Sequence, residues 1–272
     1  RRTSALLDEE KKMGKLEGKV AVITASTRSI GRGIAEAYLA EGAKVVVSGR
    51  SEEKGAAALE EMNAGDNATF IACDATSQAD VEGLIEGAIE HFGQLDIAVL
   101  NAGGIMSPHP VAEMTDESWN YTLNLNLNHT FWGMRKALQH MLPRETGRII
   151  AISSVEGKMR TETVSHYVAT KHAINGLVKV AAHEVGASGV TVNAILPGFV
   201  RTDLFYDHGP ATVEAMGMDD LEDLATYYSQ GSAIKKPNTI EQVAAVAVML
   251  ARDEARNFTA CLFPCDGGTM PY

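Results

Sequence analysis

The stretch Val20-Ala-Val-Ile-Thr-Ala-Ser-Thr-Arg-Ser-Ile-Gly-Arg-Gly33 decides the fold. It begins as a continuous apolar run, passes through a turn of small residues and enters a helical pattern at about 30–41. The first N–H groups of such a helix have no partner within the helix, and together with the helix dipole they attract an anion. The stretch therefore predicts a strand, a phosphate-binding turn and a helix in direct succession.

The same alternation continues along the rest of the chain. The further strand-like runs are Lys44–Ser48, Thr69–Ala72, Ile97–Leu100, Arg148–Ser153, Val190–Ile195 and Ala260–Phe263. Helical patterns separate them at about 52–63, 77–92, 116–142, 165–187 and 240–251. Continuous apolar strands are typical of a parallel sheet that is covered on both faces. We expect a single α/β domain over residues 18–272, a doubly wound parallel β-sheet (Rossmann fold), after an N-terminal extension at 1–17.

Composition excludes several classes of protein. The 272 residues are 45% hydrophobic, and the formal net charge of −11 argues against a nucleic-acid partner. The cysteines lack the spacing of a zinc site or a disulfide framework, and no other cluster has metal-ligand spacing, so we expect no catalytic metal. There is no apolar run that could span a bilayer and no secretory h-region. These observations predict a cytoplasmic protein with no membrane partner.

Residues 199–239 break the alternation of strands and helices. The segment is long and mixed, and it follows the sixth strand, at the edge of the sheet where open α/β folds bind ligands. Long insertions in compact domains are commonly lids or binding loops. We expect a substrate-binding lid in which Tyr206 and His208 touch the substrate. A helical surface excursion or a subunit contact remains the alternative.

The segment Tyr167-Val-Ala-Thr-Lys171 places a phenol and an ammonium on one face of a helix. A neighbouring cation favours the phenolate, so a tyrosine with an ordinary pKa of about 10 shifts toward neutrality. Such a tyrosine can exchange a proton with a ketone or alcohol oxygen. Taken alone, the pair also fits an ordinary surface contact.

The end of the second strand indicates which dinucleotide the turn would bind. An acidic residue there would bind a ribose 2′-OH, but the sequence Ser48-Gly49-Arg50-Ser51 has no carboxylate. Arg50 instead offers a planar fork that suits a 2′-phosphate, and Arg28 in the turn is a second cation. The pattern favours NADP(H) over NAD(H).

Several ordered motifs resemble the short-chain dehydrogenase/reductase family from about Gly18 to Gly268. They are Thr24–Gly31 (T-G-x-x-x-G-x-G in the family), Asp74, Asn101–Gly103 (N-A-G), Asn126, Ser154 thirteen residues before Tyr167, Pro197–Thr202 (P-G-x-x-x-T) and Asp266–Gly268 (D-G-G). Two departures stand out, because Ala25 and Ser29 occupy places where the family has glycine. We expect cofactor binding to survive both.

The resemblance implies a set of roles. Tyr167 would protonate a carbonyl oxygen that Ser154 holds, Lys171 would lower the tyrosine pKa and hold the nicotinamide ribose, and Asn126 would position a water that links Lys171 to solvent. The implied cofactor-binding residues are Thr24, Ser26, Arg28, Ser29, Ile30, Gly31, Arg50, Asp74, Ala75, Asn101, Ala102, Gly103, Tyr167, Lys171, Pro197, Gly198, Val200 and Thr202. The candidate substrate contacts are Glu156, Phe199, Tyr206 and His208.

Three functions are compatible with these residues. The first is an NADP(H)-dependent carbonyl reductase or alcohol dehydrogenase for a fairly apolar small molecule. The second is a 3-oxoacyl-thioester reductase; the acidic lid argues against it, whereas Lys235 and Lys236 favour a contact with an acidic carrier. The third is a nucleotide-sensing binding protein, which typically lacks the tyrosine or the lysine. The resemblance also implies a homo-oligomer, a tetramer or a dimer, formed through the helices that contain Asn126 and Tyr167.

Overall fold

Seven parallel strands form one sheet in the order β3-β2-β1-β4-β5-β6-β7. The computed structural model describes residues 14–270, without the side chains of residues 204, 208, 211 and 215. The strands are β1 (Val20–Ile23), β2 (Lys44–Gly49), β3 (Ala68–Ala72), β4 (Ile97–Leu100), β5 (Gly147–Ile152), β6 (Val190–Pro197) and β7 (Leu262–Cys265). The order reverses direction between β1 and β4, as in a doubly wound sheet. The predicted fold class is confirmed, whereas most of the predicted extension, residues 1–13, lies outside the described residues.

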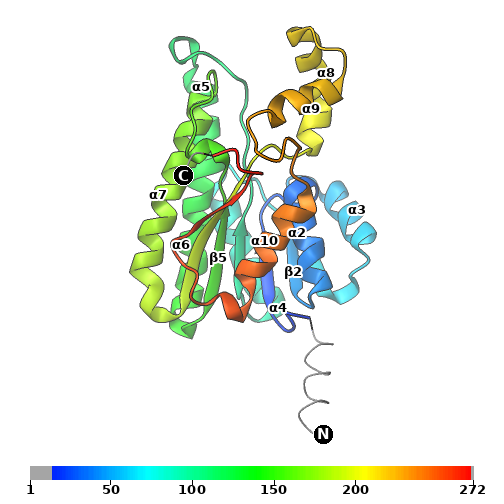
Figure 1. The fold of residues 1–272 in the computed structure, drawn as a ribbon. Helices are drawn as coiled ribbons and strands as arrows, with labels where there is room; N and C mark the ends of the chain where they lie inside the picture. Colours follow the sequence, from blue (N-terminus) through cyan, green and yellow to red (C-terminus); the bar gives the residue numbers. More distant parts are fainter. Residues whose placement is uncertain (1–13, 271–272) are drawn as a thin grey trace, which may run out of the picture.

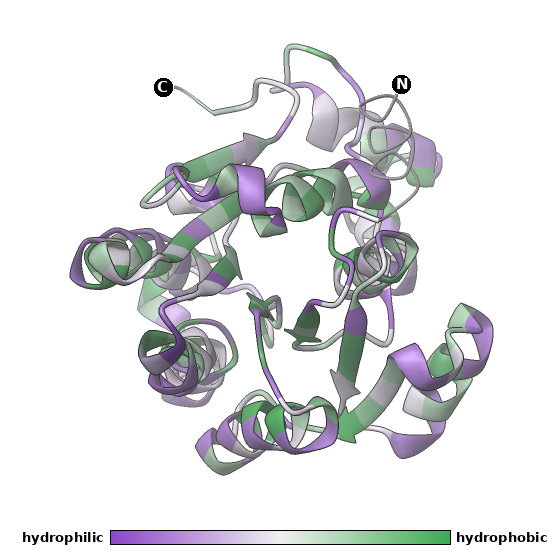
Figure 2. Cartoon of the chain, turned by 90° about the horizontal axis from the view of Figure 1, so that it is seen from below, coloured by the Kyte–Doolittle hydropathy of each residue, from purple (hydrophilic) through white to green (hydrophobic). Residues whose placement is uncertain are grey.

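Helices cover both faces of the sheet (Figure 1). One face packs against α2 (Ser29–Ala40), α3 (Glu52–Met62) and α10 (Ile240–Ala251). The other packs against α4 (Gln78–Phe92), α6 (His129–Met141) and α7 (Ser165–Val185). Figure 2 views the molecule from below, with helices on either side of the strands. Two covered faces explain why the strand sequences are mostly apolar.

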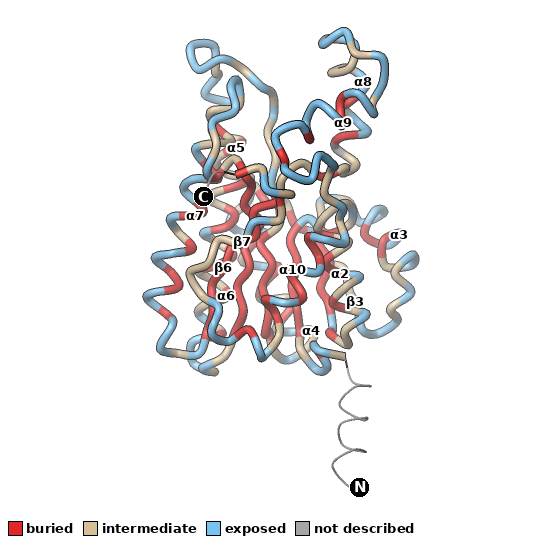
Figure 3. The backbone as a smooth tube through the Cα atoms, in the orientation of Figure 1, coloured by how far each residue is buried: buried red, intermediate tan, exposed pale blue. Residues whose placement is uncertain are grey.

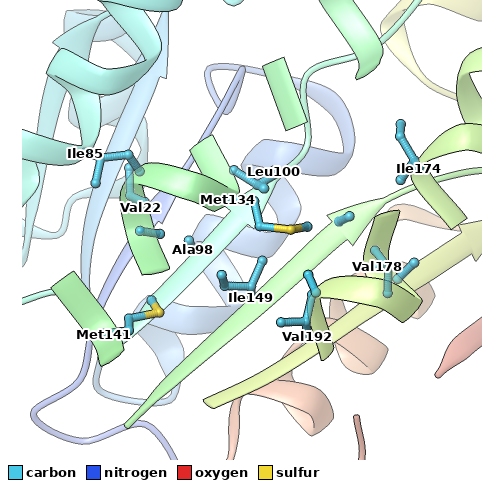
Figure 4. Close-up of a cluster of buried hydrophobic side chains, with 14 of the residues drawn as sticks. Val22, Ile85, Ala98, Leu100, Met134, Met141, Ile149, Ile174, Val178 and Val192 are labelled. Atoms are coloured by element: carbon cyan, nitrogen blue, oxygen red, sulfur yellow. The ribbon is translucent and has the colours of Figure 1, made fainter. Parts of the chain in front are cut away.

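The core on the second face fixes the strands against α6 and α7. Val22 and Ile149 from the sheet meet Met134 of α6 and Val178 of α7 (Figure 4). All four side chains are almost fully buried, and each such burial stabilises the fold by about 1.5–3 kcal/mol. In Figure 3 the inner strands are buried over most of their length, so the packed core fixes the position of their carboxyl ends.

The helix predicted at 116–142 is interrupted. It consists of α5 (Asp116–Leu123), a π-helical turn at Asn124–Asn128 and α6. A π-turn adds a residue to the helix and often marks a functional site. Here the Thr130 hydroxyl donates to the carbonyl of Asn126 at 2.7 Å, and the Asn126 side chain is fully buried.

The last strand begins two residues later than the sequence predicts, at Leu262 rather than Ala260. Ala260 has a positive φ of 59°, which interrupts regular strand geometry, although its N–H already donates to the Val192 carbonyl of β6 at 2.9 Å. The next backbone N–H, of Cys261, donates to the side chain of Asn193 in β6 at 3.1 Å instead of to a backbone carbonyl of that strand.

The segment 199–239 is largely helical, where the sequence showed a long mixed insertion. It contains α8 (Asp203–Met216) and α9 (Leu221–Ser229), which project beyond the carboxyl ends of the strands (Figure 1). Asp220 starts α9 because its carboxylate accepts from the N–H groups of the first turn. The two helices share a small core around Phe205 and Leu224. None of the helices within the described residues has the length and apolar content needed to cross a membrane.

Candidate active site

A cleft of about 700 Å³ opens at the carboxyl ends of the strands. Its walls come from the turn after β1, the ends of β2 and β5, the residues after β3, β4 and β6, and one face of α7. The predicted residues that line it are Arg28, Ser29, Ile30, Arg50, Asp74, Ala75, Asn101, Ala102, Gly103, Ser154, Tyr167, Lys171, Pro197, Gly198, Phe199, Val200 and Thr202. The fold thus brings together motifs that are spread over most of the chain.

The turn after β1 fits an anion. Ala25 and Ser29, which replace the family's glycines, have positive φ angles of 51° and 54°. The backbone therefore keeps the left-handed conformation that glycine adopts without strain. Arg28, the residue before α2, makes no side-chain hydrogen bond to the helix N-terminus. The first N–H groups of α2 thus face the cleft without a side-chain cap, which suits the pyrophosphate of a dinucleotide.

Thr24, Asn101 and Gly31 support this turn from below. The Thr24 hydroxyl oxygen accepts from the backbone N–H of Asn101 at 2.8 Å and of Ala102 at 3.0 Å. The Asn101 side-chain amide donates to the carbonyls of Thr24 at 2.9 Å and Ala25 at 3.1 Å. A Cβ on Gly31 would lie 2.5 Å from the Ala25 oxygen, so only glycine fits without a shift. Thr24 and Gly31 position the turn rather than line the cleft.

Ser26 is buried beneath the turn, whereas Asp74 lines the cleft. The Ser26 hydroxyl is buried, donates to the Ile23 carbonyl at 2.7 Å and accepts from the Ser48 N–H at 2.9 Å, so it joins the turn to β2. Asp74 lies on the cleft wall, and its carboxylate accepts from the Thr76 N–H and hydroxyl at 2.9 and 2.8 Å. Within the described residues no three His, Cys, Asp or Glu side chains are grouped so as to hold a metal ion.

The first turn of α3, near the end of β2, contributes a cation that the sequence reasoning missed. Lys54 lines the cleft together with Arg50. The sequence feature that could have indicated Lys54 is its position four residues after Arg50. Neither side chain has an ion-pair partner in the described part of the chain. Arg28 also lines the cleft, but its guanidinium pairs with Asp207 of α8 at 3.0 Å.

Tyr167 and Lys171 lie on one face of α7, as their spacing predicts. The Lys171 Nζ is 5.2 Å from the centre of the Tyr167 ring and donates to the Ile152 carbonyl at 2.9 Å. Ser154 lies two residues after the end of β5 and begins a short 3₁₀ turn, Val155–Gly157, where its hydroxyl accepts from the Glu156 N–H at 3.2 Å. Strand β5 and helix α7 therefore bring the hydroxyl, the phenol and the ammonium to one place.

Burial dominates the protonation of these groups. Desolvation raises the pKa of Tyr167 to about 12, a hydrogen bond with Ser154 acts in the opposite direction, and the Glu156 charge raises it further. Desolvation also lowers the pKa of Lys171 to about 7. Desolvation of both groups thus opposes the lowering of the tyrosine pKa expected from Lys171, and that role of Lys171 stays a prediction. A phenol that stays protonated at neutral pH is suited to donating its proton to a carbonyl oxygen.

Asn126 lies one layer behind the cleft. Its amide donates to the carbonyls of Gly104 at 2.7 Å and Thr122 at 2.8 Å. A Cβ on Gly103 would lie 2.8 Å from the Asn126 Oδ1 and 3.2 Å from the Lys171 Nζ. Gly103 therefore lies beside both the Asn126 amide and the Lys171 ammonium, and its lack of a side chain leaves room for the two groups.

Two further residues position the serine. The buried Ser153 hydroxyl donates to the Asn175 Oδ1 at 2.8 Å, and the Asn175 amide donates to the Gly157 carbonyl at 3.0 Å. These bonds hold the turn that begins at Ser154 onto α7. The sequence contained a signal for Asn175, because it follows Lys171 by four residues and so lies on the same helix face.

Phe199 is the candidate substrate residue that lines the cleft. Its ring lies 5.1 Å from the rings of both Phe205 and Tyr228, so an aromatic wall extends from the cleft into α8 and α9. Tyr206 is 52% exposed, its ring lies 5.4 Å from that of Phe205, and it is not among the residues that line the cleft.

The other two candidates lie elsewhere. The Glu156 carboxylate accepts from the hydroxyl of Thr161 at 2.7 Å, and Glu156 is not among the residues that line the cleft. The His208 side chain lies outside the described residues, so its contact with a substrate stays a prediction.

Comparison with known proteins decides the family. The family model described as short chain dehydrogenase matches residues 19–211, which include the β1 turn, Ser154, Tyr167 and Lys171. The chain belongs to the short-chain dehydrogenase family. It is therefore an oxidoreductase of a family that acts on CH–OH and C=O groups with a nicotinamide dinucleotide.

Relatives within the family act on different molecules. The chain is 36% identical over 270 residues to a 3beta-hydroxysteroid dehydrogenase of Mediterraneibacter gnavus, which covers 96% of this chain and 98% of that protein. It is 34% identical to a D-beta-hydroxybutyrate dehydrogenase of Rhizobium meliloti, over 92% of this chain and 98% of the relative. It is 33% identical to a 3-oxoacyl-[acyl-carrier-protein] reductase of Escherichia coli, over 93% of this chain and 97% of that reductase.

A solved structure agrees with the fold. The crystal structure of a variant actinorhodin polyketide ketoreductase with NADPH matches with a TM-score of 0.88 and 30% sequence identity. The match covers 96% of this chain and all of the ketoreductase.

Proposed function

We propose that this short-chain dehydrogenase transfers hydride between NADP(H) and a ketone or secondary alcohol. The observation that supports this most directly is the convergence of Ser154, Tyr167 and Lys171 on the cleft that the β1 turn also lines. Such a reaction needs a proton donor and an anion-binding turn that face one cleft.

The dinucleotide, when bound, supplies the hydride. The β1 turn at Ser29 and Ile30 would hold its pyrophosphate, Asp74 and Ala75 its adenine end, and the segment Pro197–Thr202 its nicotinamide end. In the direction of reduction, Tyr167 gives its phenolic proton to the carbonyl oxygen.

The polar neighbours of Tyr167 would complete the proton transfer. Ser154 donates a hydrogen bond to the oxygen on which charge develops, which stabilises the transition state more than the ground state. Lys171 holds the ribose and returns a proton toward Tyr167. Asn126 would connect Lys171 to solvent through a water.

The preference for NADP(H) follows from charge at the end of β2. Arg50 and Lys54 line the cleft there, and no carboxylate occupies the position that would bind a 2′-OH. Arg50→Gln should weaken binding of NADPH more than binding of NADH. Equal losses for both dinucleotides would contradict the preference.

The aromatic wall favours an apolar carbonyl compound. Phe199, Phe205 and Tyr228 form a surface without charge that leads out of the cleft, and the 3beta-hydroxysteroid dehydrogenase is similar over nearly the whole chain. The alternative is a 3-oxoacyl thioester, because the Escherichia coli reductase is similar over nearly the same length.

A panel assay tests the function and separates the two substrates. We would follow nicotinamide absorbance with NADPH and cyclic ketones, steroid ketones, aliphatic ketones and acetoacetyl thioesters. We expect turnover of the apolar ketones to exceed that of the thioesters. Faster reduction of the thioesters would favour the alternative, and no turnover of any carbonyl compound would contradict the proposal.

We further propose that α8 and α9 act as the lid over this cleft, and that the protein is a cytoplasmic homo-oligomer, a dimer or tetramer. The exposed Phe131 of α6 and Val180 of α7 support an interface on these helices. A monomer in light scattering would contradict the oligomer.

A further inference from the structure

The polar side chains of the phosphate turn are bonded to the lid helix. The Ser29 hydroxyl donates to the Asp203 carboxylate at 2.6 Å and accepts from the Asp203 N–H at 3.3 Å. The Arg28 guanidinium pairs with the Asp207 carboxylate, four residues further along α8, at 3.0 Å. The carboxylates of two α8 residues, Asp203 and Asp207, thus bind the side chains of two neighbouring residues of the turn.

The same turn lies against the end of β2. A Cβ on Gly49 would lie 3.1 Å from the Thr27 side chain, so Thr27 and Gly49 are in close contact. These two residues directly precede Arg28 and Arg50 in the sequence. Arg28 therefore lies between the acidic helix on one side and the cationic end of β2 on the other. The guanidinium fork binds a carboxylate and a phosphate with the same geometry, so the two anions compete for it.

We propose that Asp207 is a specificity-determining residue for the dinucleotide: its carboxylate occupies Arg28 in the free protein, and a 2′-phosphate must displace it. This inference rests on the proposed preference for NADP(H). Asp207 lowers affinity for the phosphorylated dinucleotide and leaves the unphosphorylated one unaffected. Asp207 also couples the lid to the cofactor. When the 2′-phosphate binds Arg28, the ion pair between Arg28 and Asp207, which joins α8 to the turn, is broken.

The size of the effect follows from exposure. The Arg28 and Asp207 side chains are 55% and 54% exposed, so water and salt screen their attraction. Surface pairs of this kind change an equilibrium by about two- to fivefold. The cost to NADPH binding should therefore lie in that range and should shrink as ionic strength rises.

The test is a comparison of dissociation constants measured by calorimetry. The ligands are NADPH, NADH and 2′,5′-ADP, which has the 2′-phosphate but no pyrophosphate. The variants are Asp207→Asn, Arg28→Gln and the double variant, with Glu214→Gln as a matched control that removes an exposed acid from the same helix. Thermal melting of each variant shows whether it is folded.

We expect Asp207→Asn to bind NADPH and 2′,5′-ADP about two- to fivefold more tightly with NADH unchanged, and Glu214→Gln to match the parent protein. The gain should vanish in the Arg28→Gln background. An equal gain for NADH, or a gain that persists without Arg28, would show a general charge effect and overturn the inference. If Arg28→Gln weakens NADPH binding but Asp207→Asn does not strengthen it, the inference fails while the cofactor preference stands. Absence of dinucleotide binding in the parent protein would refute the proposed function itself.

Discussion

Burial of the Lys171 ammonium should make the stability of this protein depend on pH. The side chain is 2% exposed, and its Nζ donates to one backbone carbonyl, that of Ile152. Desolvation lowers its pKa from 10.5 to about 7. The variant Lys171→Met keeps most of the apolar stem and removes the titrating group.

The sign follows from proton counting. Between pH 7 and 10.5 the unfolded chain keeps a proton on Lys171 that the folded protein has lost. The unfolded state binds more protons there, so the free energy of unfolding rises with pH. Integrated from pH 7 to pH 9, this group adds about 2 kcal/mol. Below pH 7 both states hold the proton, and its contribution approaches a constant.

The assay is urea unfolding at pH 6, 7, 8 and 9, with the parent protein and Lys171→Met measured side by side. We expect their difference in unfolding free energy to change by about 2 kcal/mol between pH 7 and 9 and little between pH 6 and 7. The control Lys179→Met removes an exposed lysine from the same helix and should leave the pH dependence unchanged. Parallel curves for the parent protein and Lys171→Met would refute the reasoning.

Three further variants test the support of the phosphate turn. Ala25→Gly should stabilise the fold by up to about 1 kcal/mol in urea unfolding, since φ at this position is 51°; a loss would mean that the turn is unstrained. Gly31→Ala should weaken NADPH binding roughly tenfold or more in a fluorescence titration, because the new Cβ would lie 2.5 Å from the Ala25 oxygen; unchanged binding would show that the turn yields freely. His129→Leu should destabilise the protein by about 1–3 kcal/mol, because the Thr24 hydroxyl already accepts two N–H groups and needs the His129 Nε2, at 2.9 Å, to accept its hydrogen. A neutral result on thermal melting would contradict that assignment.

Much of this architecture could be predicted because the signals are local. Apolar strands separated by helical patterns gave the doubly wound sheet, and β4 begins and ends at the predicted residues. The spacing of Tyr167 and Lys171 placed them on one helix face, which the structure confirms.

The features that were missed depend on packing between distant segments. The π-turn that turns Asn126 inward has no sequence signature, since a continuous helical pattern runs through it. The pKa of Tyr167 depends on how far the fold desolvates the phenol and the ammonium together. The pairing of Arg28 with Asp207 joins residues 179 apart in sequence. No local pattern indicates any of these three.

The turnover of Tyr167→Phe tests the central claim most directly. The substitution keeps the ring in the cleft and removes the group that gives the proton to the carbonyl oxygen. With dinucleotide binding unchanged in a titration, we predict that reduction of every ketone the parent protein accepts is lost or falls by at least about a hundredfold. Turnover equal to that of the parent protein would contradict the assignment of Tyr167 as the acid.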